Sequence, residues 1–376
     1  MKVYLDNAST TQIDPMVLEA MLPFLKKDYG NSFSPNKMGE SAMEAIEKSR
    51  IIIAKSINAM PEEIIFTSGG TESNNFAIKG VAFANRDKGN HIITTKIEHK
   101  SVSKSCEWLE EQGFEITYLD VDEKGFLNVG DLEKAITDKT ILVSIIHGQN
   151  EIGTIQDLNA LGDICKKHNI YFHTDACQSY TKTEINVQEQ AIDLISLNAH
   201  KIHGPKGVGA LYLRNGTKIN AWQNGGAQER GLRAGTDNVA GIVGFAKAVE
   251  LDSNIEYINS LKEQLINGFF AIDKIKMNNN QYGLPHIISI SFFGIEGEAI
   301  VASLDLEDIY VATGSACSSN DLQPSNSLLA IKLTPQEANS TVRFSLSRFN
   351  TEQEIDKLLD VLPKTVEKLR KISPFK

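Results

Sequence analysis

The sequence has few cysteines, and none of them are closely spaced. Cys106, Cys165, Cys177 and Cys317 are the four present, and no two form a CxxC pair. A structural zinc site and a disulfide framework are therefore not expected. In a reducing compartment each thiol is either a small buried apolar group or a reactive one.

The sequence also lacks an excess of positive charge and a long apolar run. Lys and Arg number 38 against 48 Asp and Glu, a formal net charge of −10. General nucleic-acid binding is disfavoured, because it needs clustered cations to neutralise phosphates. No apolar stretch is long enough to cross a bilayer, and the first residues lack the apolar core of a signal peptide. We expect a cytoplasmic protein with no membrane partner and no direct nucleic-acid partner.

Repeats, low-complexity runs and Pro/Gly-rich linkers are missing as well. The chain instead alternates short apolar, β-branched runs with helical patterns such as that of residues 158–168. This alternation predicts βαβ units and an α/β fold, with a mainly parallel, seven-stranded sheet covered on both faces. The predicted strands are residues 64–67, 91–95, 115–119, 141–146, 170–174, 194–197 and 208–213.

After Gly241 the pattern changes. We expect one long helix over residues 238–270, an extended segment at 287–293, and helices near 298–306 and 352–371. These elements predict a smaller α+β domain. The predicted division is a large domain over residues 16–250 and a small domain formed by residues 1–15 and 251–376.

Ligands of parallel α/β sheets bind beyond the carboxyl ends of the strands, and three polar groups occur there. Ser68-Gly69-Gly70-Thr71 follows the first predicted strand and opens a helix, which suits a phosphate, although an ordinary turn with a Ser/Thr cap is the commoner explanation of such a segment taken alone. Asp175 ends an apolar strand, where it could face a protonated pyridine nitrogen or simply cap the next helix. Lys201 follows another strand, where it could form a Schiff base or be a solvated loop lysine.

These segments resemble the class V aminotransferase-type fold, and specifically the cysteine desulfurases of the NifS/IscS group, over essentially the whole chain. The resemblance rests on Tyr4-Leu5-Asp6-Asn7-Ala8-Ser9-Thr10-Thr11, on Thr67 to Asn75, on Asn150-Glu151-Ile152-Gly153-Thr154, and on His173-Thr174-Asp175. Further matching segments are His200-Lys201 with its Gly-Pro-Lys-Gly tail, Gly231-Leu232-Arg233-Ala234-Gly235-Thr236, Gly314-Ser315-Ala316-Cys317 and Arg343-Phe344-Ser345-Leu346.

The resemblance implies a fold type I enzyme that uses pyridoxal 5′-phosphate, with Lys201 as the covalent attachment point. It implies that Asp175 pairs with the pyridine nitrogen, that His99 stacks on the ring and handles protons, and that Arg343 holds the substrate carboxylate. Cys317 is implied as the nucleophile that receives sulfur. The remaining implied cofactor contacts are Gly70, Thr71, His200, Asn150 (also near substrate), Gln178, and Thr236 from a partner subunit of a homodimer.

Cys317 also fits the nucleophile's role by its own context. It lies in a small, polar stretch, Gly314-Ser315-Ala316-Cys317-Ser318-Ser319-Asn320, in which we expect an exposed loop. Cys165, in contrast, falls on an amphipathic helix, and Cys177 adjoins Asp175 where packing is the simpler role. A thiolate is the reacting species, so the activity should depend on what lowers the pKa of Cys317.

Two departures from the family pattern stand out. Asn198 occupies a position where the family usually has a Ser or Thr that donates to the phosphate, although its amide can also donate. Ser32-Phe33-Ser34-Pro35-Asn36 replaces a Pro-Ser-Ser segment near the expected substrate entrance.

The function expected from the resemblance is conversion of L-cysteine to L-alanine, with sulfur passing to an enzyme persulfide. Acceptor proteins for iron–sulfur cluster assembly or tRNA thiolation would then take the sulfur. A selenocysteine lyase, or a related lyase or transaminase, is the alternative enzyme. A sulfur-relay or scaffold protein without chemistry is the non-enzymatic alternative, which the retained Lys201, Asp175, Arg343 and Cys317 disfavour.

Overall fold

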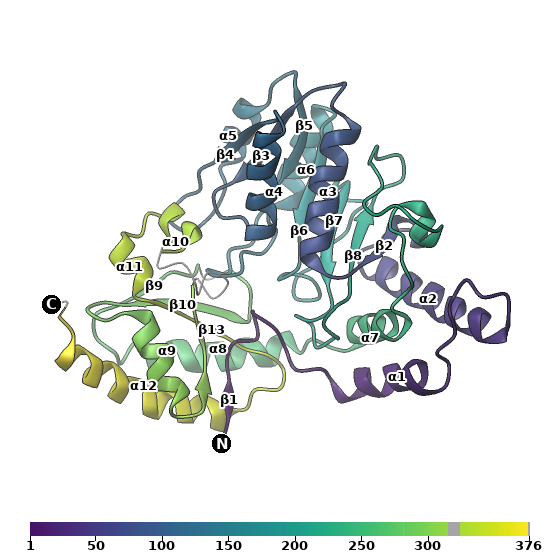
Figure 1. Ribbon diagram of the computed structural model, residues 1–376. Coiled ribbons are helices and arrows are strands. Elements are labelled where there is room, and N and C mark those ends of the chain that lie inside the picture. Colours follow the sequence, from purple (N-terminus) through teal and green to yellow (C-terminus); the bar gives the residue numbers. More distant parts are fainter. Residues whose placement is uncertain (281, 315–323, 375–376) are drawn as a thin grey trace.

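The computed structural model describes residues 1–280, 282–314 and 324–374. Its largest element is a seven-stranded sheet with helices on both faces, and smaller sheets lie below it in Figure 1. The sheet is mainly parallel, as predicted, since only β8 runs antiparallel to its neighbours. The strands in spatial order are β2 (Ile64–Thr67), β8 (Gly209–Leu213), β7 (Leu194–Asn198), β6 (Tyr171–Asp175), β5 (Thr140–Ser144), β3 (His91–Thr95) and β4 (Glu115–Leu119).

Side chains that alternate along the strands build a separate core on each face of this sheet. Ile64 and Phe66 of β2 pack on one side, and Ile65 packs on the other. The first side is covered by α2 (Lys37–Ser56), α5 (Val129–Ala135), α6 (Leu158–Lys167) and α7 (Val239–Glu250), and the second by α3 (Gly70–Ala84) and α4 (Lys100–Glu111). Burial of each Leu, Ile or Phe side chain in these cores contributes about 1.5–3 kcal/mol to the stability of the fold.

The carboxyl-terminal third forms a third core around an antiparallel sheet. Its four strands are β12 (Ala312–Thr313), β13 (Thr341–Ser345), β10 (Ile287–Phe292) and β9 (Ile275–Met277). The helices in this region are α8 (Ile255–Phe269), α9 (Gly297–Asp305), α10 (Asn326–Ala330), α11 (Pro335–Asn339) and α12 (Glu352–Ile372). The amino terminus also lies here, because β1 (Val3–Tyr4) pairs in parallel with β11 (Ile309–Tyr310).

The predicted helix over residues 238–270 is wrong, because two helices occupy that stretch. α7 ends at Glu250 and α8 begins at Ile255. Between them the Asp252 carboxylate accepts a hydrogen bond from the N–H of Asn254, whose φ of +52° is left-handed. Asp and Asn compete with helical hydrogen bonding through such local bonds, which explains the break.

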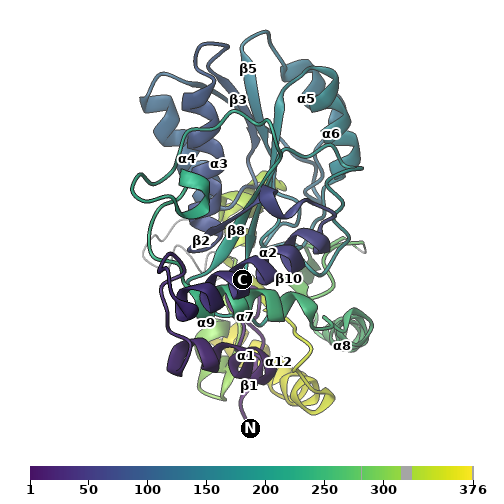
Figure 2. The same cartoon turned by 90° about the vertical axis from the view of Figure 1, so that its right-hand side faces the viewer.

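The remaining helical elements lie at the start of the chain and beside the large sheet. α1 (Pro15–Lys26) begins where the Asp14 side chain accepts from the N–H of Met16, and two short 3₁₀ turns are η1 (Pro61–Glu63) and η2 (Gln228–Gly231). Figure 2 turns α1, α2 and α7 toward the viewer. Within the described ranges, none of the helices combines the length and apolar character needed to span a bilayer.

Candidate active site

A cavity of about 710 Å³ opens at the carboxyl ends of β3, β5, β6 and β7. The predicted site residues that line it are Gly70, Thr71, His99, Asn150, Asp175, Gln178, Asn198, His200, Lys201 and Arg343. Sequence-distant segments therefore meet at the edge of the sheet that parallel topology favours for ligands.

Two predicted residues are not among those that line the cavity. Thr236 is exposed and lies outside the cavity of its own chain. Cys317 lies outside the described residues. Gly314 and Pro324, the described residues that precede and follow 315–323, both line the cavity.

The start of α3 provides an uncapped set of backbone donors beside the cavity. Gly69, the residue before the helix, offers no side chain to cap it and has a φ of +149°, which favours glycine. A Cβ on Gly70 would lie 2.3 Å from the Cys177 sulfur, so glycine is needed for the close approach. The free N–H groups of this first turn suit an anion such as a phosphate.

Charges around this helix start are balanced within the protein. Glu72 pairs with Arg233 at 2.8 Å, and its other oxygen accepts from the N–H of Ser68 at 2.7 Å. Burial raises the pKa of Glu72, but these hydrogen bonds lower it by a larger amount. The pKa of Glu72 is therefore below its ordinary value. The carboxylate is therefore committed to its own partners.

Asn198 and His200 flank the same region from the end of β7. The side-chain oxygen of Asn198 is buried and has no hydrogen-bond partner among the described residues. His200 contacts the Thr10 hydroxyl at 3.2 Å. Burial, with the charges of Lys201 and Lys206, lowers the pKa of His200 to about 4, so the ring is neutral at pH 7.

Asp175 is buried at the end of β6 and remains ionised. The Asp175 carboxylate accepts hydrogen bonds from the N–H of Cys177 at 2.9 Å and from the amide of Asn74 at 2.7 Å. Burial raises the pKa of Asp175, but His99 and these two hydrogen bonds lower it by more, so the pKa lies below its ordinary value. A buried carboxylate held in this state favours a cationic partner in the cavity.

Lys201 lines the cavity, and its backbone carbonyl accepts a hydrogen bond from Nζ of Lys182 at 3.1 Å. Lys182 is partly buried, and desolvation, with the charges of Lys201 and Arg348, lowers its pKa to about 7. Lys182 therefore fixes the backbone from which the Lys201 side chain emerges.

Arg343 is buried on β13, where the amino-terminal arm holds it. Its guanidinium donates to Asp6, to the Ser9 hydroxyl and to the carbonyl of Asn150, each at 2.8 Å. Its Nε is buried and has no partner within the described part of the chain. A guanidinium has five N–H donors, so the three bonds to protein groups leave Arg343 with donor capacity beside the cavity.

Gln178 connects the cavity wall to the rest of the fold. Its side-chain nitrogen donates to the carbonyl of Ala8 at 2.7 Å, and its oxygen meets the ring of His286 at 3.2 Å. Together with Thr10 and Ser9, this contact attaches the amino-terminal arm to the site.

The three described cysteines are buried packing groups. Burial raises the pKa of Cys106, of Cys165 and of Cys177, and for Cys177 the charge of Asp175 adds to the effect. A protonated, inaccessible thiol is a poor nucleophile. The packing role predicted for Cys177 agrees with this environment.

Several polar residues at the site were not assigned from the sequence. Asp6 and Ser9 stand in the quoted arm motif, but only the structure brings them to Arg343. Glu98, Asn74 and Lys182 gave no signal of their own, since each makes a contact to a residue in another segment of the chain. They could have been selected only by asking which polar residues fall at positions predicted to be buried.

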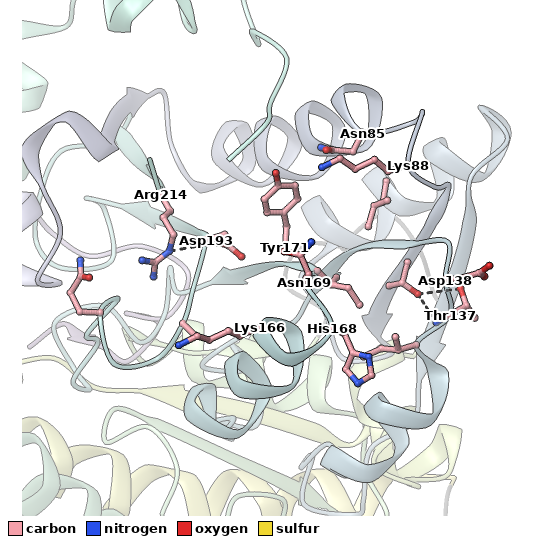
Figure 3. Close-up of a pocket in the computed structure, with 16 residues that line it drawn as sticks. Asn85, Lys88, Thr137, Asp138, Lys166, His168, Asn169, Tyr171, Asp193 and Arg214 are labelled. Carbon is pink, nitrogen blue, oxygen red and sulfur yellow. Dashed lines mark hydrogen bonds and ion pairs between the residues drawn. The ribbon is translucent and has the colours of Figure 1, made fainter. Parts of the chain in front are cut away.

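A second hollow, of about 770 Å³, lies at the opposite edge of the sheet, before β5, β6 and β7 (Figure 3). It contains no residue predicted for the site. Arg214 pairs there with Asp193 at 3.6 Å and donates to the carbonyls of Ile192 and Val187. Its cation is therefore used within the protein. Among the described residues, no group of His, Cys, Asp and Glu could hold a metal ion.

Comparison with known proteins places these features in a family. The aminotransferase class-V family model matches residues 3–358. The chain is 50% identical over 382 residues to a protein from Dictyoglomus turgidum named cysteine desulfurase IscS, covering 100% of this chain and 97% of that protein. A protein of the same name from Clostridium botulinum is 48% identical over 383 residues, covering 100% and 96%.

Solved structures give the same result. One described as a NifS-like protein superposes with a TM-score of 0.93 at 37% identity, covering 98% of this chain and all of the other. Another, described as SspA in complex with cysteine, has a TM-score of 0.85 at 37% identity, covering 93% and 100%.

Proposed function

The chain belongs to the aminotransferase class-V family, and from this membership we infer that it is a pyridoxal-phosphate-dependent cysteine desulfurase. The observation that carries the inference is a single cavity that holds an attachment lysine, a buried ionised aspartate and a partly unpaired arginine. The reaction is the conversion of L-cysteine to L-alanine, with the sulfur retained by the enzyme.

The residues of the cavity fit pyridoxal phosphate. The uncapped turn at Gly70 and Thr71, together with Asn198 and His200, suits the phosphate. Asp175 suits the protonated pyridine nitrogen, and Lys201 the aldehyde carbon. Gln178 and Asn150 would lie near the ring oxygen, and His99 against the ring face. When bound, the cofactor supplies a ring that withdraws electrons from the substrate Cα.

The chain's own groups then divide the remaining work. The guanidinium of Arg343, oriented by Asp6 and Ser9, holds the substrate carboxylate. Asn150 lies beside it, with its carbonyl fixed by Arg343. The Lys201 amine takes the Cα proton and delivers a proton to the developing methyl group.

Cys317 is the proposed nucleophile. Its thiolate attacks the substrate sulfur, so that the C–S bond breaks and an S–S bond forms. Cysteine plus the Cys317 thiol gives alanine plus the Cys317 persulfide, which balances without another oxidant. An acceptor protein then takes the sulfur, either an iron–sulfur scaffold or a tRNA-thiolation enzyme.

We also propose a homodimer in which Thr236 reaches the phosphate of the partner chain. Large apolar side chains are exposed near one another in sequence on α1 and the segment after it, including Leu25, Tyr29 and Phe33. The Ser32 hydroxyl contacts the carboxylate of Asp237, which places this segment beside Thr236. An exposed apolar surface next to Thr236, which is proposed to contact the cofactor of the partner chain, supports a dimer interface at this place.

Residues 16–250 are proposed as the cofactor-binding domain, and residues 1–15 and 251–376 as the smaller domain. The separate core around the four-stranded sheet supports this division, while residues 328–338 of the smaller domain pack with the core of the large sheet. A cytoplasmic location is proposed on the basis of the composition and the free thiols.

The assignment is tested by substrate discrimination in the Lys201→Ala and Arg343→Lys variants. Lys201→Ala should bind pyridoxal phosphate without a borohydride-trappable bond and form no alanine from L-cysteine. Arg343→Lys should raise KM for L-cysteine by about tenfold or more, because a lysine cannot make the bidentate contact. Activity on L-selenocysteine but not on L-cysteine would favour the selenocysteine lyase alternative, and activity that survives Cys317→Ala would favour a transaminase.

A further inference from the structure

A line of polar side chains connects Asp175 to His99 beneath the cavity. Nδ2 of Asn74 is 2.7 Å from the Asp175 carboxylate and 2.8 Å from the Ser101 hydroxyl. That hydroxyl is 2.7 Å from Nδ1 of His99, which also lies 3.1 Å from the backbone nitrogen of Ser101. Asn74 and Ser101 are both buried.

Donor and acceptor roles along this line follow from chemistry. A carboxylate can only accept, so Asp175 requires the amide nitrogen of Asn74, and not its oxygen, to face it. The same nitrogen therefore donates to the Ser101 oxygen. The single hydroxyl proton of Ser101 is then free to donate to His99.

Nδ1 of His99 consequently receives two hydrogen bonds. One comes from the Ser101 hydroxyl and the other from the Ser101 backbone N–H, which can only donate. Nδ1 therefore carries no proton, and the ring proton of a neutral His99 is on Nε2. The charged ring needs a proton on Nδ1, where it would face both donors.

We propose that Asn74 and Ser101 are positioning residues that fix His99 as the neutral Nε2–H tautomer. His99 then meets the substrate as a hydrogen-bond donor and not as a base. This inference rests on the proposed function only for the identity of the substrate; the tautomer itself is a property of the chain. Removal of the substrate thiol proton then falls to another group.

The charges that face His99 agree with a neutral ring. Burial, Lys201 and Lys100 lower the pKa of His99, and Asp175 raises it, with a net direction down. Glu98, the preceding residue, is buried with its pKa raised to about 8, so it adds no negative charge at pH 7. Asp175 is therefore the one ionised carboxylate among these neighbours, and Asn74 stands between it and His99.

The test is a long-range ¹H–¹⁵N spectrum of the full chain labelled at histidine, recorded between about pH 5 and 9, with His99→Gln used for assignment. We expect neutral His99 to be the Nε2–H tautomer, with a pKa below the ordinary value of histidine. Ser101→Ala removes one donor to Nδ1, so His99 should bind a proton about tenfold more tightly. The pH profile of kcat/KM should then gain a decline on the acid side.

Ser105→Ala is the matched control, since Ser105 lies on the same helix and its hydroxyl donates only to the backbone carbonyl of Ser101. It should leave both the spectrum and the pH profile unchanged. An Nδ1–H signal, a His99 cation near pH 7 in the wild type, or an unchanged titration in Ser101→Ala overturns the inference. Because the spectrum needs no turnover, an enzyme inactive on cysteine with the expected tautomer would refute the proposed function alone.

Discussion

At the scale of single residues, the site combines groups that titrate far from their usual range. Glu98 is the clearest case. Its carboxyl is buried, one oxygen accepts from the Thr95 hydroxyl at 2.6 Å and the N–H of Ile146 at 2.9 Å, and the other has no partner within the described residues. Burial raises its pKa to about 8, with Asp175 adding to the effect. Glu98 is therefore a neutral acid that joins the ends of β3 and β5.

The Glu98→Gln variant should change how stability depends on pH. A folded-state pKa above the unfolded value makes the wild type lose stability as pH rises from about 4.5 to about 8. Glutamine keeps the accepting oxygen and removes the titration, so the variant should match the wild type at pH 4 and exceed it by about 5 kcal/mol above pH 8. Urea unfolding at both pH values measures this. A constant difference between variant and wild type at all pH values would refute the assignment.

Site residues could be predicted from the sequence where the residue type and its place after a strand already indicate a role. Gly70, Asp175 and Lys201 were predicted because glycine, acid and lysine follow strand ends, and the structure places all three in one cavity. Asn74 and Lys182 were not predicted, because their roles depend on contacts made across the fold. Such contacts leave no trace in local residue type.

At the scale of elements, the sequence predicted the bounds of several strands correctly but missed the break between α7 and α8. β2, β3 and β4 have the predicted bounds, because each reads as a short run rich in β-branched residues between turns. Residues 251–254 were predicted as helix because the apolar spacing continues through them. The break depends on the side-chain bond of Asp252 to Asn254, which spacing alone does not reveal.

The segment that leads to Thr236 is held by a buried ion pair. Arg50 on α2 makes two 2.8 Å bonds to Glu229, whose carboxylate also accepts from the N–H of Phe66 at 2.7 Å. Glu229 and Arg230 have φ values of +44° and +58°, an unfavourable backbone for non-glycine residues. The pair therefore holds a strained turn in place.

Glu229→Ala should destabilise the protein by about 3 kcal/mol, since it removes two of the bonds of the buried Arg50 and leaves only Glu47 and the carbonyl of Ile64 as its partners. It should also weaken pyridoxal phosphate binding if this turn positions Thr236. Thermal unfolding and equilibrium cofactor titration measure the two effects. The exposed pair Glu44–Lys48 provides the control, because Glu44→Ala should change neither. A stable Glu229→Ala variant would show that the pair does not hold the turn.

At the scale of the whole molecule, the amino-terminal arm joins the two sheets at the site. Asp6 and Ser9 reach Arg343, while Ala8 and Thr10 reach Gln178 and His200. The proposed domain division therefore has the cavity between its parts, with the arm as one of its walls. Sequence reasoning placed the arm with the smaller domain but did not predict its contacts with the site.

The proposed homodimer predicts a mass twice that of the 41.4 kDa chain in solution. Tyr29→Glu, which places a charge on the exposed apolar segment, should yield monomers that bind pyridoxal phosphate less tightly, because Thr236 then lacks a partner. Light scattering after size exclusion and cofactor titration measure this. Leu306→Glu, at an equally exposed apolar residue after α9, should remain a dimer. A monomeric wild type with full cofactor affinity would contradict the shared site.

The central claim is that this cavity moves sulfur from cysteine to Cys317. The most direct measurement is one turnover with L-cysteine, without reductant, followed by alanine quantification and mass analysis of the chain, at equal cofactor loading in wild type and Cys317→Ala. The account predicts one alanine per chain and a 32 Da addition at Cys317 (the mass of one sulfur atom by the stated reaction), with neither in the variant. Alanine formed equally by both proteins, or a cofactor-loaded wild type that forms none, would contradict it.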